Sequence, residues 1–277
     1  MTDPNYWSVL TLTTDFPVRE IVSAYFLEFC LGSIDGATES QYFFEPGKKD
    51  TVQDMINNLR EQHTFEWNWS TQQSEAWHLA WKDSFKPIMI NKDFVVVPDW
   101  DIQTKAGQLI RIRPGNAFGT GHHETTFMVL NQLPGLVRKG ISVLDVGTGS
   151  GILAIGAKLF GAGKVTCIEN DASCESNFYE NIQLNQFGDQ LVFEHADVML
   201  WKDFDYDLIL VNVSRNVIVQ LLPMLNHTSA IIVITGILLT DLTFIKQQLN
   251  ENKFRLISQN QMGEWACIII QNDEDMN

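Results

Sequence analysis

The sequence predicts an α/β fold in which a Rossmann-like domain follows a small ferredoxin-like α+β domain. Three observations predict the larger domain. From residue 141 onward, short apolar runs alternate with segments of helical apolar spacing, the pattern of a parallel sheet covered by helices. Gly147-Thr148-Gly149-Ser150-Gly151 is a glycine-rich turn after the first run, and Glu169 ends the second.

The first strand-turn-helix-strand unit predicts a nucleoside-binding site. Strands are expected over 141–146 and 165–168, with a helix over 152–160 between them. Glycine allows a tight turn, and the first N–H groups of the following helix are unpaired. Glu169 follows Gly147 by 22 residues, close to the roughly 20 expected for an acid that accepts both ribose hydroxyls.

The glycine spacing separates two cofactors. Gly147, Gly149 and Gly151 form G-x-G-x-G after Asp145, whereas a dinucleotide site has G-x-G-x-x-G. This glycine pattern resembles the first motif of S-adenosylmethionine (SAM) methyltransferases. SAM carries a sulfonium and no phosphate, so an acidic strand end suits it. We therefore predict SAM as the cofactor, with a nicotinamide oxidoreductase as a disfavoured alternative.

Residues 1–70 are predicted to form the N-terminal α+β domain. Its alternating apolar pattern favours strands over 6–12, 40–44 and 64–69 and helices over 18–31 and 52–60, an order that suggests a ferredoxin-like sandwich. The domain has 11 acids and four Lys or Arg. Such a surface can dock a basic protein, or it can simply be solvated.

Residues 71–84 are predicted to form a linker helix, because Trp77 and Trp81 lie four apart and so share one face. Residues 85–277 are assigned to the SAM-dependent domain. Short strands are expected over 87–90, 94–97 and 108–113. A loop with His122, His123 and Glu124 then leads into a helix through about Leu133. No metal site is predicted there, because adjacent side chains diverge and H-E-x-x-H is absent.

The rest of the chain continues the alternation. Strands are expected over 191–194, 207–211, 230–235, 254–258 and 266–271, and helices over 171–184, 217–225 and 239–251. Asn212 follows a buried strand, at the edge where parallel sheets bind ligands. It is either a site residue that accepts a hydrogen bond from an amine, or a cap of the next helix.

Composition narrows the class of protein. The 277 residues carry a net charge of −15, which disfavours nucleic acid as a direct partner. The four cysteines show no paired or metal-like spacing, which favours reduced thiols. No leader pattern or apolar run near 18 residues occurs. We expect a cytoplasmic monomer with no membrane contact.

Several separated motifs together resemble one family, the bacterial ribosomal protein L11 methyltransferases (PrmA). They are Trp77-x-x-x-Trp81-x-x-x-Phe85-x-Pro87, Phe118-Gly119-Thr120-Gly121-x-His123-x-Thr125-Thr126, Asp145 to Ile155, Asn212, Thr235-Gly236-Ile237-Leu238 and Glu264-Trp265. The resemblance implies a two-domain protein N-methyltransferase that transfers methyl groups from SAM to lysine or N-terminal amines of a basic ribosomal protein. It implies cofactor contacts at Thr126, Gly147, Glu169 and Asn212, to which the glycine turn adds Gly149, and Asn212 is the candidate catalytic residue.

The chain also departs from that family pattern. His122 and Glu124 replace Thr and Pro, Glu169 replaces Asp, Val213-Ser214 replaces Ile-Leu, and Asn226-His227-Thr228 replaces Pro-Gly-Gly. These changes concern the substrate more than the cofactor. Two alternatives therefore stay open: a methyltransferase of the same fold acting on another protein or a nucleobase nitrogen, and a non-catalytic SAM-binding scaffold. The sequence offers no general base.

Overall fold

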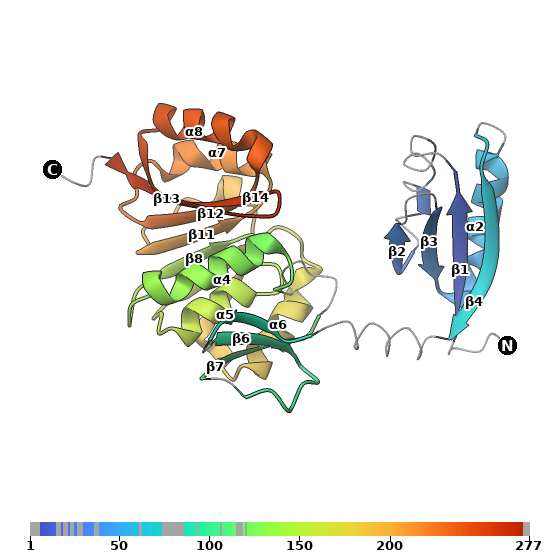
Figure 1. The fold of residues 1–277 in the computed structure, drawn as a ribbon, viewed down its shortest axis with the longest axis horizontal. Helices are drawn as coiled ribbons and strands as arrows, with labels where there is room; N and C mark the ends of the chain where they lie inside the picture. Colours follow the sequence, from blue (N-terminus) through green and yellow to red (C-terminus); the bar gives the residue numbers. More distant parts are fainter. Residues whose placement is uncertain are drawn as a thin grey trace. The chain divides into compact units, whose positions relative to one another are not determined.

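A computed structural model describes residues 6–14, 18, 22, 25–26, 30–35, 39–60, 63–73, 86–92, 94–105, 107–114, 119 and 121–273. The chain divides into two compact units, Met1–Phe85 and Lys86–Asn277 (Figure 1). Each unit has its own hydrophobic core.

The N-terminal unit is a four-stranded antiparallel sheet with the order β2-β3-β1-β4. Its elements are β1 (Tyr6–Thr13), β2 (Gly32–Asp35), β3 (Glu39–Phe44), η1 (Pro46–Lys48), α2 (Lys49–Leu59) and β4 (Glu66–Gln73). Leu10 and Leu12 of β1 pack with Phe44 and with Ile56 of α2 in a fully buried core. The three predicted strands and the second predicted helix are confirmed.

Two features of this unit differ from the prediction made from the sequence. The short strand β2 was not predicted, because Gly32 and Asp35 disfavour strands locally; it forms by pairing with β3 at the edge of the sheet. The predicted linker helix is wrong at 71–73, where β4 continues to Gln73 as it pairs with β1. The rest of that range, with Trp77 and Trp81, lies outside the described residues, as does most of the predicted helix over 18–31.

The second unit is built on a seven-stranded sheet of order β10-β9-β8-β11-β12-β14-β13, in which β14 runs antiparallel to the other six strands. The strands are β8 (Val143–Val146), β9 (Val165–Glu169), β10 (Leu191–His195), β11 (Leu208–Asn212), β12 (Ile231–Leu238), β13 (Phe254–Met262) and β14 (Trp265–Asn272). All seven coincide with predicted strands, and the last two pair with each other.

Helices cover both faces of this sheet (Figure 1). They are α4 (Glu124–Leu136), α5 (Ile152–Leu159) and α6 (Cys174–Leu184) on one face, and α7 (Arg215–Leu225) and α8 (Leu242–Glu251) on the other. Short 3-10 turns are η2 (Gly188–Gln190), η3 (Val198–Leu200) and η4 (Leu239–Asp241). The sheet has a hydrophobic core on each face, and neighbouring strand residues point into opposite cores. Val143 packs in the core under α4, α5 and α6, and Leu144 packs in the core under α7 and α8. The central strands β8, β11 and β12 are therefore mostly apolar, as expected when both faces are buried.

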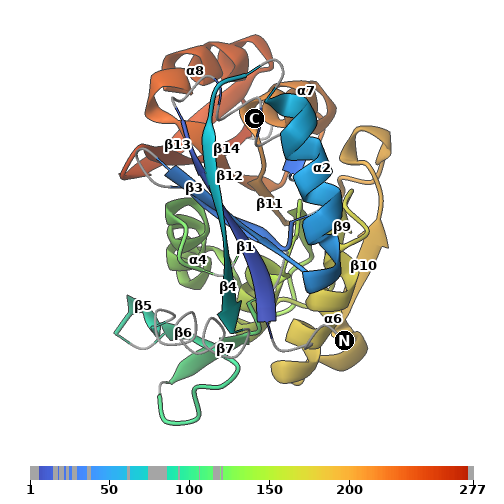
Figure 2. The same cartoon turned by 90° about the vertical axis from the view of Figure 1, so that its right-hand side faces the viewer.

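A second, three-stranded sheet packs beside α5 and α6, and Figure 2 shows its strand β7 near α6. It consists of β5 (Ile88–Asn91), β6 (Phe94–Pro98) and β7 (Gln108–Ile112), each of which was predicted. Phe94 meets Phe160 edge-to-face, with ring centroids 5.1 Å apart. No helix in the described part of the chain has the length and apolarity needed to cross a bilayer.

The strand order fixes where a ligand can bind. From β8 the chain builds outward through β9 and β10, and then returns to the other side of β8 with β11. In such sheets the crevice lies beyond the carboxyl ends of the strands at this point of reversal. The residues that follow β8 and β11, including Gly147 and Val213, are therefore neighbours.

Candidate functional site

The glycine turn after β8 needs its glycines for conformation and for space. Gly147, Gly149 and Gly151 all have positive φ, of 70°, 52° and 81°. A Cβ on Gly147 would lie 2.6 Å from Cγ1 of Val213, at the end of β11. The turn therefore lies directly against the end of β11, and a side chain at position 147 would collide with Val213.

Glu169 is held by backbone N–H groups of the same turn and its own loop. Its Oε2 accepts a hydrogen bond from Gly149 N at 2.9 Å, and its Oε1 accepts bonds from Asn170 N and Asp171 N at 2.9 and 3.0 Å. A carboxylate offers about four acceptor positions, so it can still bind a hydroxyl. The longer side chain of Glu, compared with Asp, reaches Gly149 while keeping this capacity.

Asp145 lies beneath the turn and is fully buried. Burial raises its pKa to about 7, and the hydrogen bond that the Thr148 hydroxyl donates to it, 2.7 Å long, opposes the rise. The acid therefore titrates near neutral pH inside the fold.

Asn181 of α6 ties the turn to the three-stranded sheet. It is fully buried; its Nδ2 donates to the carbonyl of Ser150 at 2.9 Å, and its Oδ1 accepts from Arg113 N at 2.7 Å. Sequence reasoning missed this residue. A signal was present, because Asn181 shares the apolar face of its helix with Phe178 and Ile182, where a polar residue needs hydrogen-bond partners.

Asn212 ends β11, and its side chain is joined to the first turn of α4. Its Nδ2 donates to Oγ1 of Thr126 at 3.5 Å, and Thr126 is fully buried. With the amide nitrogen directed there, the amide oxygen is left as an acceptor. Ser214, and not Asn212, is the residue that precedes α7, so the structure gives Asn212 no capping position.

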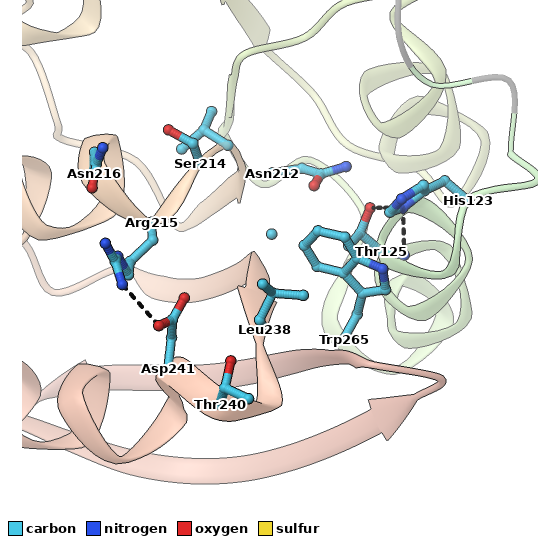
Figure 3. A pocket seen from close by; sticks show the side chains of 12 residues that line it. His123, Thr125, Asn212, Ser214, Arg215, Asn216, Leu238, Thr240, Asp241 and Trp265 are labelled. Atoms are coloured by element: carbon cyan, nitrogen blue, oxygen red, sulfur yellow. Dashed lines mark hydrogen bonds and ion pairs between the residues drawn. The ribbon is translucent and has the colours of Figure 1, made fainter. Parts of the chain in front are cut away.

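Asn212 also lines a cavity of about 690 Å³ (Figure 3). It lies at the ends of β11 and β12, between the start of α4 and β14. Its lining residues are His123, Thr125, Asn212, Val213, Ser214, Arg215, Asn216, Gly236, Leu238, Thr240, Asp241 and Trp265. Asn212 therefore contributes both to this cavity and to the strand end beside the glycine turn.

His123 and Trp265 form one wall of the cavity. Their rings meet at 63° with centroids 5.0 Å apart. Nδ1 of His123 lies 2.8 Å from the Thr125 hydroxyl and accepts from Thr125 N, which caps α4 (Figure 3). Sequence reasoning did not assign this wall to a site, because Trp265 is 142 positions away from His123 in the chain.

The loop before α4 is partly described. His122 is exposed at the surface, while Glu124 lies against the hairpin turn at Gly263, where an added Cβ would be 3.2 Å from Oε1 of Glu124. The three neighbouring side chains thus take separate positions. The carbonyl of Gly119 accepts a bond from the Ser150 hydroxyl, whereas Phe118 and Thr120 lie outside the described residues.

Comparison with known proteins places these features in one family. The family described as "Ribosomal protein L11 methyltransferase (PrmA)" matches residues 32–273. A protein of that name from Alkaliphilus metalliredigens is 35% identical over 200 residues, which cover 70% of this chain and 63% of the relative. A protein of the same name from Dictyoglomus turgidum is 31% identical over 230 residues, which cover 81% of this chain and 76% of the relative. The match thus spans less than two thirds of the first relative.

A solved structure supports the same grouping. The crystal structure of ribosomal protein L11 methylase from Lactobacillus delbrueckii subsp. bulgaricus superposes with a TM-score of 0.63 at 29% identity. The aligned part covers 68% of this chain and 99% of that chain.

Proposed function

The chain belongs to the ribosomal protein L11 methyltransferase family, and from this premise we propose that it transfers the methyl group of SAM to lysine or N-terminal amines of ribosomal protein L11. One observation carries the proposal. Asn212 lines a cavity of about 690 Å³ that can take an acceptor, and its backbone carbonyl oxygen lies 3.6 Å from where a Cβ of Gly147 would be, beside the glycine turn where we place the cofactor. A methyltransferase needs two adjacent sites of this kind.

We propose that SAM binds over the glycine turn. The residues there fit it: the Glu169 carboxylate is fixed by three N–H groups and retains capacity for a ribose hydroxyl, and the missing Cβ of Gly147 lets the turn lie against Val213 at the end of β11. Gly149, Thr126 and Asn212 complete the proposed contacts. SAM supplies the electrophilic methyl group, so the protein's main task is alignment.

The acceptor amine must arrive without its proton. With a lysine pKa of about 10.4, deprotonation at pH 7 costs on the order of 4 to 5 kcal/mol. Trp265, Leu238 and Val213 give the cavity apolar walls, and desolvation there disfavours the ammonium. The Asn212 amide oxygen then accepts an N–H of the neutral amine and orients its lone pair, while the released proton goes to water.

We propose that the N-terminal unit is a ferredoxin-like docking domain. Its sheet order, β2-β3-β1-β4, supports the fold. Its charge supports the docking role, because residues 1–70 contain 11 acids and only four Lys or Arg. Such a surface attracts a basic ribosomal protein through long-range electrostatics.

Four free thiols are compatible with a reducing cytoplasm.

The proposal is tested by labelling. The purified protein is incubated with isotope-labelled SAM and a lysate from cells that lack this gene, and labelled proteins are identified by mass spectrometry. Gly147→Arg, which fills the cofactor turn, is the control. Label in ribosomal protein L11 that is lost with the variant supports the proposal. Label in another protein or in nucleic acid would contradict the substrate, and no label despite SAM binding would favour a scaffold.

A further inference from the structure

Arg215 occupies a position that local helix energetics disfavour. It is the first residue of α7, where a cation meets the positive end of the helix dipole. In the structure, Nη1 of Arg215 donates to Oδ1 of Asp241 at 2.8 Å, and both side chains line the cavity that Asn212 borders. Figure 3 shows this pair across the cavity from Trp265 and His123.

The pair leaves binding capacity on Arg215. The ion pair joins a single guanidinium nitrogen to a single carboxylate oxygen, although the guanidinium carries five N–H donors in a fork suited to carboxylates. The Arg215 side chain is 46% exposed and that of Asp241 is 22% exposed. Arg215 is therefore the more accessible member of the pair.

The cavity is large enough to admit more than one side chain. At about 690 Å³, it lies within the roughly 300–1,000 Å³ of pockets that enclose drug-sized molecules. Asn212, Trp265, Leu238, Arg215 and Asp241 all line this one cavity, so an acceptor amine placed at Asn212 would share the cavity with the Arg215–Asp241 pair.

Building on the proposed function, we propose that Arg215, oriented by Asp241, selects acceptor segments with an acidic side chain next to the methylated amine. The acid forms a charge-assisted, forked hydrogen bond with the guanidinium. The protein as a whole has a net charge of −15, which repels acidic ligands. The proposed preference for an acid is therefore a local effect of Arg215. A purely structural ion pair between α7 and η4 predicts no such selectivity.

The test uses the full-length protein and three peptides, identical except for Glu, Gln or Lys beside a single acceptor lysine. Peptide affinity is measured by fluorescence anisotropy in the presence of S-adenosylhomocysteine, and methyl transfer is measured separately with SAM. Wild type should bind the Glu peptide about tenfold more tightly than the Gln peptide, and the Lys peptide most weakly. Arg215→Gln should abolish this difference, whereas Arg255→Gln, the same change at an exposed site outside the cavity, should preserve it.

Asp241→Asn keeps an acceptor for the Arg215 guanidinium but removes the competing negative charge, so it should preserve or increase the preference for Glu. Equal wild-type affinities for the Glu and Gln peptides would overturn the inference, even where both peptides are methylated and the proposed function stands. Discrimination that depends on Arg215, without methyl transfer to any peptide or to ribosomal protein L11, would support the selectivity and contradict the proposed function. Absence of both binding and transfer would contradict both.

Discussion

Gly149 N donates a hydrogen bond to Oε2 of Glu169 at 2.9 Å, so the glycine turn and the acid of the next strand form one rigid unit. The acid is thereby fixed before any cofactor arrives. Preorganisation of this kind reduces the entropy lost on binding.

We predict that Glu169→Gln weakens SAM binding about 10-fold to 100-fold, because hydrogen bonds to a charged group contribute about 1.5–3 kcal/mol. Isothermal titration with SAM measures the effect. Glu175→Gln removes the same charge from an exposed position on α6 and should leave the dissociation constant unchanged. An unchanged constant in Glu169→Gln would remove this acid from the cofactor site.

Gly147→Ala should abolish or strongly weaken SAM binding and lower the melting temperature. The alanine has an unfavourable φ of 70° and a Cβ 2.6 Å from Cγ1 of Val213. Adding Val213→Ala removes the close contact and should restore part of the stability, but not the strain in φ. Gly135→Ala, with open space around the site, is the control and should be neutral or stabilising. Wild-type behaviour of Gly147→Ala would refute the described turn.

The pKa of Asp145 predicts a pH dependence of stability. It is about 7 in the folded protein against an ordinary 3.8, so between these values the folded state retains a proton that the unfolded state releases. The contribution of Asp145 to the free energy of unfolding therefore falls as pH rises through this window and is constant above about pH 7.

Asp145→Asn keeps an acceptor for the Thr148 hydroxyl and removes this titration. Between pH 5 and pH 8, wild type should lose on the order of 2 kcal/mol more stability than the variant. Urea unfolding at both pH values tests this, because titration of all other groups is shared by the two proteins. Parallel pH profiles would show that Asp145 is ionised in the folded state at pH 5.

The sequence predicted best where structure is determined locally. The glycine turn and the runs on either side of it are encoded within residues 141–169, so β8, α5 and β9 could all be predicted. Strand β2 could not, because the local preferences of Gly32 and Asp35 oppose the strand that pairing with β3 produces. The range of the predicted linker was wrong at 71–73 for the same reason, since the length of β4 depends on pairing with β1.

The residues of the candidate site likewise differ in how far the sequence could predict them. Gly147, Gly149 and Glu169 lie close in sequence, and the structure joins them as one unit. The cavity, in contrast, depends on the folded arrangement. Distant segments meet at the ends of β11 and β12, and only there do His123 and Trp265 form a wall and Arg215 and Asp241 form an ion pair. The meeting of Asn212 with Thr126 was accessible only through the family resemblance, which assigned both to the cofactor.

The most direct test of the central claim is the initial rate of methyl transfer to purified ribosomal protein L11 at saturating SAM, followed by intact-mass spectrometry. Wild type should add methyl groups. Asn212→Ala should reduce the rate about 100-fold, because it removes the group that orients the amine, whereas Asn216→Ala, in the same cavity, should stay within a few-fold of wild type. An unmodified L11 despite bound SAM, or an Asn212→Ala rate equal to wild type, would contradict the account.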